Sequence, residues 1–172
     1  MSRIKICGLR RPEDIAAVNE ARPDYCGFIV EYPKSRRSID RATLRELVRG
    51  LREEIVPVGV FVNAPKELVA ELLEEGTIQI AQLHGQESQE YIQELKVLTE
   101  KPLIQAFSVK TREDVERARK SAADYILLDQ GSGGTGKSFD WSLVGEVGRL
   151  YFLAGGLGVE NLREAIGMLH PW

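Results

Sequence analysis

The amino-acid sequence predicts an α/β fold in which a parallel β-sheet is covered by helices. Short apolar runs of strand length alternate with longer amphipathic stretches of helical spacing, and this alternation repeats seven times along the 172 residues. The apolar runs lack the strict alternation of a sheet with one face in water, so both faces are expected to be covered. Right-handed crossovers repeated in this way form either an open, doubly wound sheet or a (β/α)8 barrel, here with seven units.

Seven strands are expected, each a short apolar run bounded by turn-forming or charged residues. In chain order they are Ile4–Cys7, Cys26–Val30, Val56–Val62, Ile78–Leu83, Leu103–Phe107, Tyr125–Leu128 and Tyr151–Ala154. Prolines and capping side chains mark where the helices between them begin, at Pro12, Asp40, Pro65, Thr111 and Asp140.

The composition indicates one domain. With 172 residues, 43% of them hydrophobic, and no linker-like stretch, residues 1–172 are expected to bury one core. The net charge of -3, with basic residues interleaved among acidic ones, argues against a nucleic-acid partner. No apolar run approaches the roughly 18 residues of a membrane span, and no signal peptide is recognisable. We therefore expect a cytoplasmic protein without a membrane partner.

Chemically active side chains lie where the predicted strands end, which is where parallel βα folds place their active sites. They are Cys7, Arg36, Arg37, Asn63, Gln82, His84 and Asp129. Each has an ordinary structural explanation when taken alone, because free cysteines usually pack, aspartates cap loops and paired arginines are commonly solvated. A thiol, a guanidinium and a carboxyl at one rim are nevertheless unusual, so a functional site is predicted there. Cys26 starts its strand at the opposite end and is expected in the core.

Two glycine-rich segments follow strands at the same end. Residues 131–138 complete the letters of the GxxxxGK[ST] phosphate-binding loop. We reject nucleotide hydrolysis, because that loop normally follows the first strand of a sheet and this segment follows the sixth. Gly155 and Gly156 follow the seventh strand, where (β/α)8 barrels often bind phosphate.

The chain resembles the phosphoribosylanthranilate isomerases of tryptophan biosynthesis. The resemblance is carried in chain order by Lys5–Gly8, Gly27–Phe28, Ser35–Arg37, Val58–Asn63, Gln82–Gly85, Leu127–Asp129, Gly133–Trp141, Ala154–Leu157 and Glu160–Asn161. It implies a TIM (β/α)8-type barrel and an Amadori rearrangement that converts N-(5-phosphoribosyl)anthranilate to 1-(2-carboxyphenylamino)-1-deoxyribulose 5-phosphate. The resemblance implies no metal and no organic cofactor.

The resemblance makes Cys7 the general base and Asp129 the general acid. Cys7 would have to lose its proton near neutral pH, although a free thiol has a pKa of about 8.5. Asp129 would have to keep its proton, although a free aspartate carboxyl has a pKa of about 3.9. Positive groups at the rim would favour the thiolate, and desolvation under a bound substrate would favour the neutral carboxyl.

The same resemblance implies the substrate contacts. The residues concerned are Arg37, Gln82, His84, Gly134, Gly136, Gly155 and Gly156. The planar guanidinium of Arg37 would hold the anthranilate carboxylate, and Gln82 and His84 would line the pocket. The amides around Gly155 and Gly156 would bind the ribose phosphate, with the Gly134–Gly136 segment beside them.

The chain departs from the resembled family at its C-terminus. The family continues with an eighth strand and helix that carry half of the phosphate site, and the sequence reaches Trp172 where that strand would begin. We expect open sheet edges, and either a monomer or a homodimer that associates through them. A non-catalytic barrel fragment or assembly module is one alternative. Another phosphosugar barrel enzyme, such as one of histidine biosynthesis, is less favoured because those enzymes resemble repeated half barrels with paired aspartates.

Overall fold

The computed structural model describes residues 2–130 and 140–172, so the predicted site residues Gly134 and Gly136 lie outside the described part of the chain. The structure divides into two compact units, Arg3–Leu103 and Ile104–Trp172, with the N-terminal Ser2 assigned to the second. None of the helices in the described ranges combines the length and the apolar surface that crossing a membrane requires.

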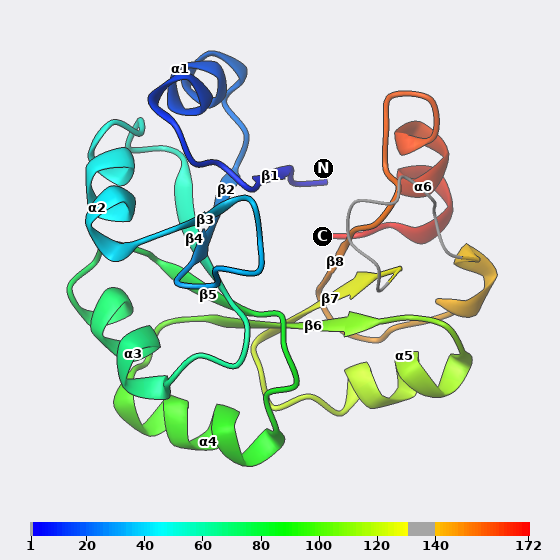
Figure 1. Ribbon diagram of the computed structural model, residues 1–172. Coiled ribbons are helices and arrows are strands. Elements are labelled where there is room, and N and C mark those ends of the chain that lie inside the picture. The colour runs from blue at the N-terminus through cyan, green and yellow to red at the C-terminus, as the bar shows by residue number, and fades with distance from the viewer. Residues whose placement is uncertain (1, 131–139) are drawn as a thin grey trace. The chain divides into compact units, whose positions relative to one another are not determined.

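The first unit is a parallel sheet flanked by helices (Figure 1). Its strands are β1 (Lys5–Cys7), β2 (Tyr25–Val30), β3 (Ser38–Ile39), β4 (Val56–Phe61) and β5 (Ile80–Leu83). They pair in the order β1-β2-β4-β5, and β3 adds to β2. The connecting helices are α1 (Pro12–Ala21), α2 (Arg41–Arg49), α3 (Lys66–Glu74) and α4 (Gln89–Leu98).

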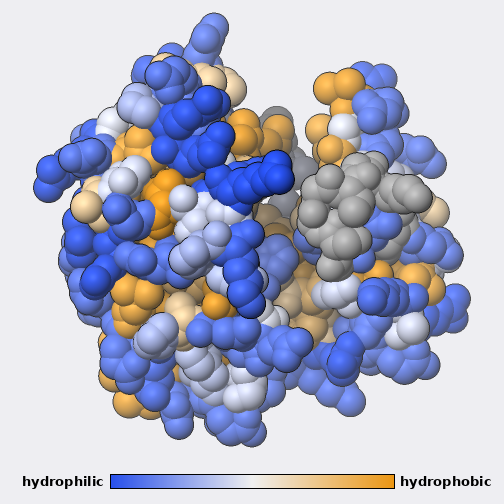
Figure 2. Space-filling view, in the orientation of Figure 1, coloured by the Kyte–Doolittle hydropathy of each residue, from blue (hydrophilic) through white to orange (hydrophobic). Residues whose placement is uncertain are grey.

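Local capping explains where the helices of this unit begin. Pro12 is the first residue of α1, a position at which the missing N–H costs no hydrogen bond. Asp40 accepts a hydrogen bond of 2.8 Å from the Thr43 amide and so caps α2, as expected. Each helix then buries an apolar stripe against the strands, with Leu44 and Leu72 fully buried. The visible outer surface of these helices is mainly hydrophilic in Figure 2.

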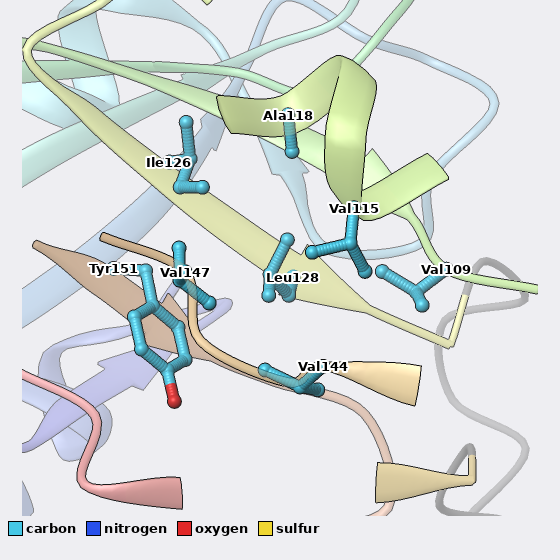
Figure 3. Packing of buried hydrophobic residues seen from close by; sticks show 8 residues of the cluster. All are labelled: Val109, Val115, Ala118, Ile126, Leu128, Val144, Val147 and Tyr151. Carbon is cyan, nitrogen blue, oxygen red and sulfur yellow. The ribbon is translucent and has the colours of Figure 1, made fainter. Parts of the chain in front are cut away.

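The second unit repeats the strand-helix alternation. It consists of β6 (Leu103–Ser108), α5 (Arg112–Arg119), β7 (Tyr125–Asp129), a 3-10 helix (Trp141–Leu143), β8 (Tyr151–Leu153) and α6 (Leu162–Leu169). The parallel pairs β6-β7 and β7-β8 form its sheet. Figure 3 shows Val115 and Ala118 of α5 directed toward Ile126 and Leu128 of β7, and Tyr151 belongs to the same buried cluster. This packing fixes the end of β7, where Asp129 lies.

All seven predicted strands are present to within two residues at either end, and the structure adds the short β3. One helix prediction is wrong. Asp140 caps only a 3-10 turn, accepting a hydrogen bond of 3.0 Å from the Ser142 amide, instead of starting a longer helix. Gly145 and Gly148 explain the early end, because both have positive φ angles, 55° and 70°, that a right-handed helix cannot contain.

Candidate functional site

Cys7 ends β1 with its side chain exposed at the C-terminal end of the strand. The chain turns at Gly8, whose φ of +93° favours glycine and whose amide donates a hydrogen bond of 2.9 Å to the Gly27 carbonyl. A Cβ at Gly8 would stand 2.6 Å from Cδ and 3.1 Å from Nη1 of Arg37. The first unit therefore brings the predicted base and the predicted carboxylate-binding arginine together across Gly8.

A pocket of about 540 Å³ opens beside this pair, lined by residues of β1, α1 and the Arg36–Arg37 segment. Four arginines line it, Arg10, Arg11, Arg36 and Arg37, with Asp14 as the carboxylate among them. Asp14 is already engaged, because hydrogen bonds from the Arg10 and Arg11 amides and the charge of Arg11 lower its pKa. The excess of guanidinium groups suits an anionic ligand.

Gln82 and His84 are two residues apart at the end of β5, and their side chains lie next to each other. The Gln82 side chain is 2% exposed, and its Nε2 lies 2.9 Å from Nδ1 of His84. With the amide nitrogen as donor, His84 accepts this hydrogen bond at Nδ1. The Gln82 Oε1 atom is buried and has no hydrogen-bond partner within residues 2–130 and 140–172. The pair is thus held in place and retains a free acceptor.

Glu87 is a structural residue of this rim that the sequence analysis missed. Its carboxylate is buried and accepts hydrogen bonds from the amides of Asn63, at 2.7 Å, and Gly85, at 2.8 Å. Asn63 in turn accepts a bond of 2.7 Å from the Gln86 amide through Oδ1. These bonds tie the loop after β4 to the loop after β5. A carboxylate two residues after a glycine at a strand end was the sequence signal that could have identified it.

Asp129 ends β7 with its side chain 7% exposed, and its Oδ1 accepts a hydrogen bond of 2.7 Å from the Gln130 amide. The turn after β8 approaches it closely. Gly155 and Gly156 have φ angles of +85° and +65°, and a Cβ at Gly155 would stand 2.5 Å from Asp129 Oδ1. Asn161 anchors this turn by donating to the Gly156 carbonyl at 2.8 Å. The second unit therefore brings the predicted acid beside the predicted phosphate-binding glycines.

Cys26 is fully buried in β2, as expected for a core residue. Burial raises the pKa of its thiol to about 12, so it stays protonated at neutral pH. Of the two cysteines in the sequence, Cys7 is exposed and Cys26 is buried. Among the described residues, no group of three His, Cys, Asp or Glu side chains is arranged to hold a metal ion.

Comparison with known proteins identifies the family. The family model described as N-(5'phosphoribosyl)anthranilate (PRA) isomerase matches residues 4–171. The N-(5'-phosphoribosyl)anthranilate isomerase of Endomicrobium trichonymphae is 42% identical over the whole chain, which covers 86% of that protein. The corresponding protein of Acetivibrio thermocellus is 41% identical, and the chain covers 84% of it.

Solved structures agree with this result. The phosphoribosyl anthranilate isomerase of Thermotoga maritima is 37% identical with a TM-score of 0.87, over 99% of this chain and 85% of that one. Another isomerase structure, 35% identical, contains reduced 1-(o-carboxyphenylamino)-1-deoxyribulose 5-phosphate. These matches disfavour an enzyme of histidine biosynthesis and confirm the predicted TIM-barrel fold class. The chain belongs to the N-(5'-phosphoribosyl)anthranilate isomerase family, enzymes of the isomerase step in tryptophan biosynthesis.

Proposed function

We propose that this chain converts N-(5-phosphoribosyl)anthranilate to 1-(2-carboxyphenylamino)-1-deoxyribulose 5-phosphate, with Cys7 as general base and Asp129 as general acid. Family membership supports the reaction. The observation that supports the residue assignment is the contact of Arg37 with Gly8, the residue after the exposed Cys7, at a pocket that both Cys7 and Arg37 line.

The reaction begins with one proton donated by an acid and one removed by a base. Asp129 gives a proton to the ribose ring oxygen as the bond from C1' to that oxygen breaks and a protonated Schiff base forms, and Cys7 removes the proton from C2'. The electron pair of the broken C2'–H bond forms the C1'–C2' double bond while the pair of the C1'=N double bond returns to nitrogen, and the enol then becomes the ketone as its 2'-hydroxyl loses a proton and C1' gains one. The exposure of Cys7 suits its role, because the base must reach the substrate.

Substrate binding is assigned to the residues around these two groups. Arg37 binds the anthranilate carboxylate through two N–H groups, as its planar fork allows. The turn at Gly155 and Gly156 binds the phosphate through backbone amides, which positive φ angles can direct toward one anion. Gln82 and His84 contribute polar groups to the pocket. Gly134 and Gly136 are also proposed to contact the phosphate, on the basis of sequence alone.

The proposed reaction uses side chains alone and requires no cofactor. We propose a cytoplasmic enzyme that acts as a monomer or a homodimer. A related isomerase from Thermotoga maritima is described as dimeric, which supports self-association as one of the two possibilities.

Turnover of freshly prepared phosphoribosylanthranilate, followed by loss of its fluorescence, tests the proposal. We expect Cys7→Ser and Asp129→Asn each to lower kcat by about 100-fold or more, the usual size of a lost acid or base. Asp124→Asn is the matched control, since Asp124 is an exposed aspartate that precedes β7. Cys26→Ala controls for loss of a thiol and should retain turnover.

Two results would contradict the proposal. If Cys7→Ser and Asp129→Asn both retained wild-type turnover, the assigned roles would be wrong. If the unmodified chain failed to turn over the substrate, the alternative of a non-catalytic barrel fragment would be supported instead.

A further inference from the structure

Lys5 lies on the same face of β1 as Cys7. Residues two apart in a strand project to the same side, and Ile6 between them projects to the other. Lys5 is half-buried and Cys7 is exposed. On the neighbouring strand β2, the residue paired with Cys7 is Gly27.

Gly27 leaves room for the two side chains to approach each other. A Cβ at this glycine would stand 2.6 Å from Cys7 Sγ and 2.8 Å from Lys5 Nζ. The ammonium and the sulfur therefore share the space that any larger residue on β2 would fill. The separation of the two atoms cannot exceed the sum of those two short distances, which is close enough for their charges to interact.

The charge of Lys5 is available to the thiol. None of the ion pairs resolved within residues 2–130 and 140–172 includes Lys5. Its influence already reaches a second thiol, because Lys5 opposes the rise in the pKa of Cys26 that burial causes. Arg37 lies against Gly8, the residue that follows Cys7 in the chain.

We propose that Lys5 is a positioning residue for the general base, and that its ammonium stabilises the thiolate of Cys7 and holds the sulfur beside Gly27. Lys5 keeps its own proton throughout: the thiolate forms the S–H bond as C2'–H breaks, and the ammonium stabilises only the state before that transfer. The inference rests on the proposed function for its catalytic meaning, but the interaction itself is measurable without substrate.

The direct test is the rate at which iodoacetamide alkylates Cys7 at about pH 7. The reagent is uncharged, so Lys5 affects the rate through the thiolate and not by attracting the reagent. Mass spectrometry of peptides separates Cys7 from Cys26. We expect Lys5→Met to lower the rate about tenfold and Lys5→Arg to keep it within about threefold of the wild type, since arginine retains the charge. Lys96→Met, which removes an exposed lysine from α4, is the control and should leave the rate unchanged.

Turnover provides the second measurement. Lys5→Met should lower kcat about tenfold with a change in KM below about twofold, because the ammonium acts on the base and not on substrate binding. Gly27→Ala should lower both the alkylation rate and kcat, because its Cβ displaces the sulfur and the ammonium. Circular dichroism and urea unfolding check that each variant is folded.

An alkylation rate for folded Lys5→Met within about twofold of the wild type overturns the inference, whatever happens to turnover. Equal losses in Lys5→Met and Lys5→Arg also overturn it, because the effect would then come from packing. If Cys7→Ser retained full turnover, the assignment of Cys7 as general base would fail, but slower alkylation in Lys5→Met would still establish the charge interaction.

Discussion

The Asp129 carboxylate occupies the space that the missing side chain of Gly155 leaves open. Its Oδ1 atom lies 2.5 Å from the position of a Cβ at residue 155, closer than any real Cβ contact. The φ of Gly155, +85°, is itself a conformation that other residues adopt only with strain. The end of β7 and the turn after β8 therefore depend on a glycine for two independent reasons.

Gly155→Ala is expected to impair both activity and stability. The new methyl group must push Asp129 away from its position, and the backbone strain adds about 1 to 2 kcal/mol of lost stability. We expect kcat/KM for phosphoribosylanthranilate to fall at least about tenfold if the proposed acid is displaced. Fluorescence assays and urea unfolding measure the two effects.

Gly167→Ala is the matched control for this substitution. Gly167 lies within α6, and a Cβ there would meet no atom within 4 Å. The change should leave kcat/KM unaltered and stabilise the protein by up to about 1 kcal/mol, because alanine is the better helix former. If Gly155→Ala and Gly167→Ala lost the same kcat/KM and the same stability, the contact between Asp129 and Gly155 would not be the cause of the loss.

Arg37→Met is expected to weaken substrate binding. Removing a guanidinium that holds a carboxylate costs about 2 to 3 kcal/mol, which corresponds to an increase in KM of roughly 30- to 150-fold. Arg36→Met is the control, because the structure engages Arg36 through its backbone carbonyl, which accepts a 2.8 Å hydrogen bond from Arg10 Nη1. A larger effect on KM at Arg36 than at Arg37 would reverse the assignment.

The stability of the fold should decline in alkaline solution because of Cys26. Burial raises the pKa of this thiol to about 12, while in the unfolded chain it ionises near 9. The stabilising difference is complete below the unfolded pKa and is lost as the pH rises toward 12, since only the unfolded state then releases the proton. Urea unfolding should show the wild type losing about 1 to 2 kcal/mol more than Cys26→Ala between about pH 7 and pH 10. If the wild type and Cys26→Ala lost the same unfolding free energy over this pH range, Cys26 would not be the cause.

Glu87→Ala is expected to destabilise the protein by about 2 to 4 kcal/mol, because it leaves two backbone amides without their charged acceptor. The affected amides belong to Asn63 and Gly85. Urea unfolding measures the effect, and Glu53→Ala, at an exposed position between α2 and β4, should change stability by less than about 0.5 kcal/mol. If the two variants were equally stable, Glu87 would not be needed to join the loops.

Strand and helix positions were accessible from the sequence because period and capping are local properties. Asp40 at the start of α2 is an example in which the side chain and its backbone partner lie three residues apart. The helix expected from Asp140 failed for an equally local reason, the positive φ angles at Gly145 and Gly148. That residues 1–172 form a single barrel domain stays a prediction.

The sequence by itself determined the repeating strand-helix order, the family resemblance and the residue types at the strand ends, since all of these are properties of neighbours along the chain. Tertiary structure alone decided which distant residues meet. Arg37 reaches Gly8, Cys7 lies opposite Gly27, and Asp129 fills the space at Gly155, because parallel pairing brings separated segments into contact. Such contacts depend on the strand register and on a glycine that leaves room for the other side chain. A local sequence pattern does not predict which two segments will meet in this way.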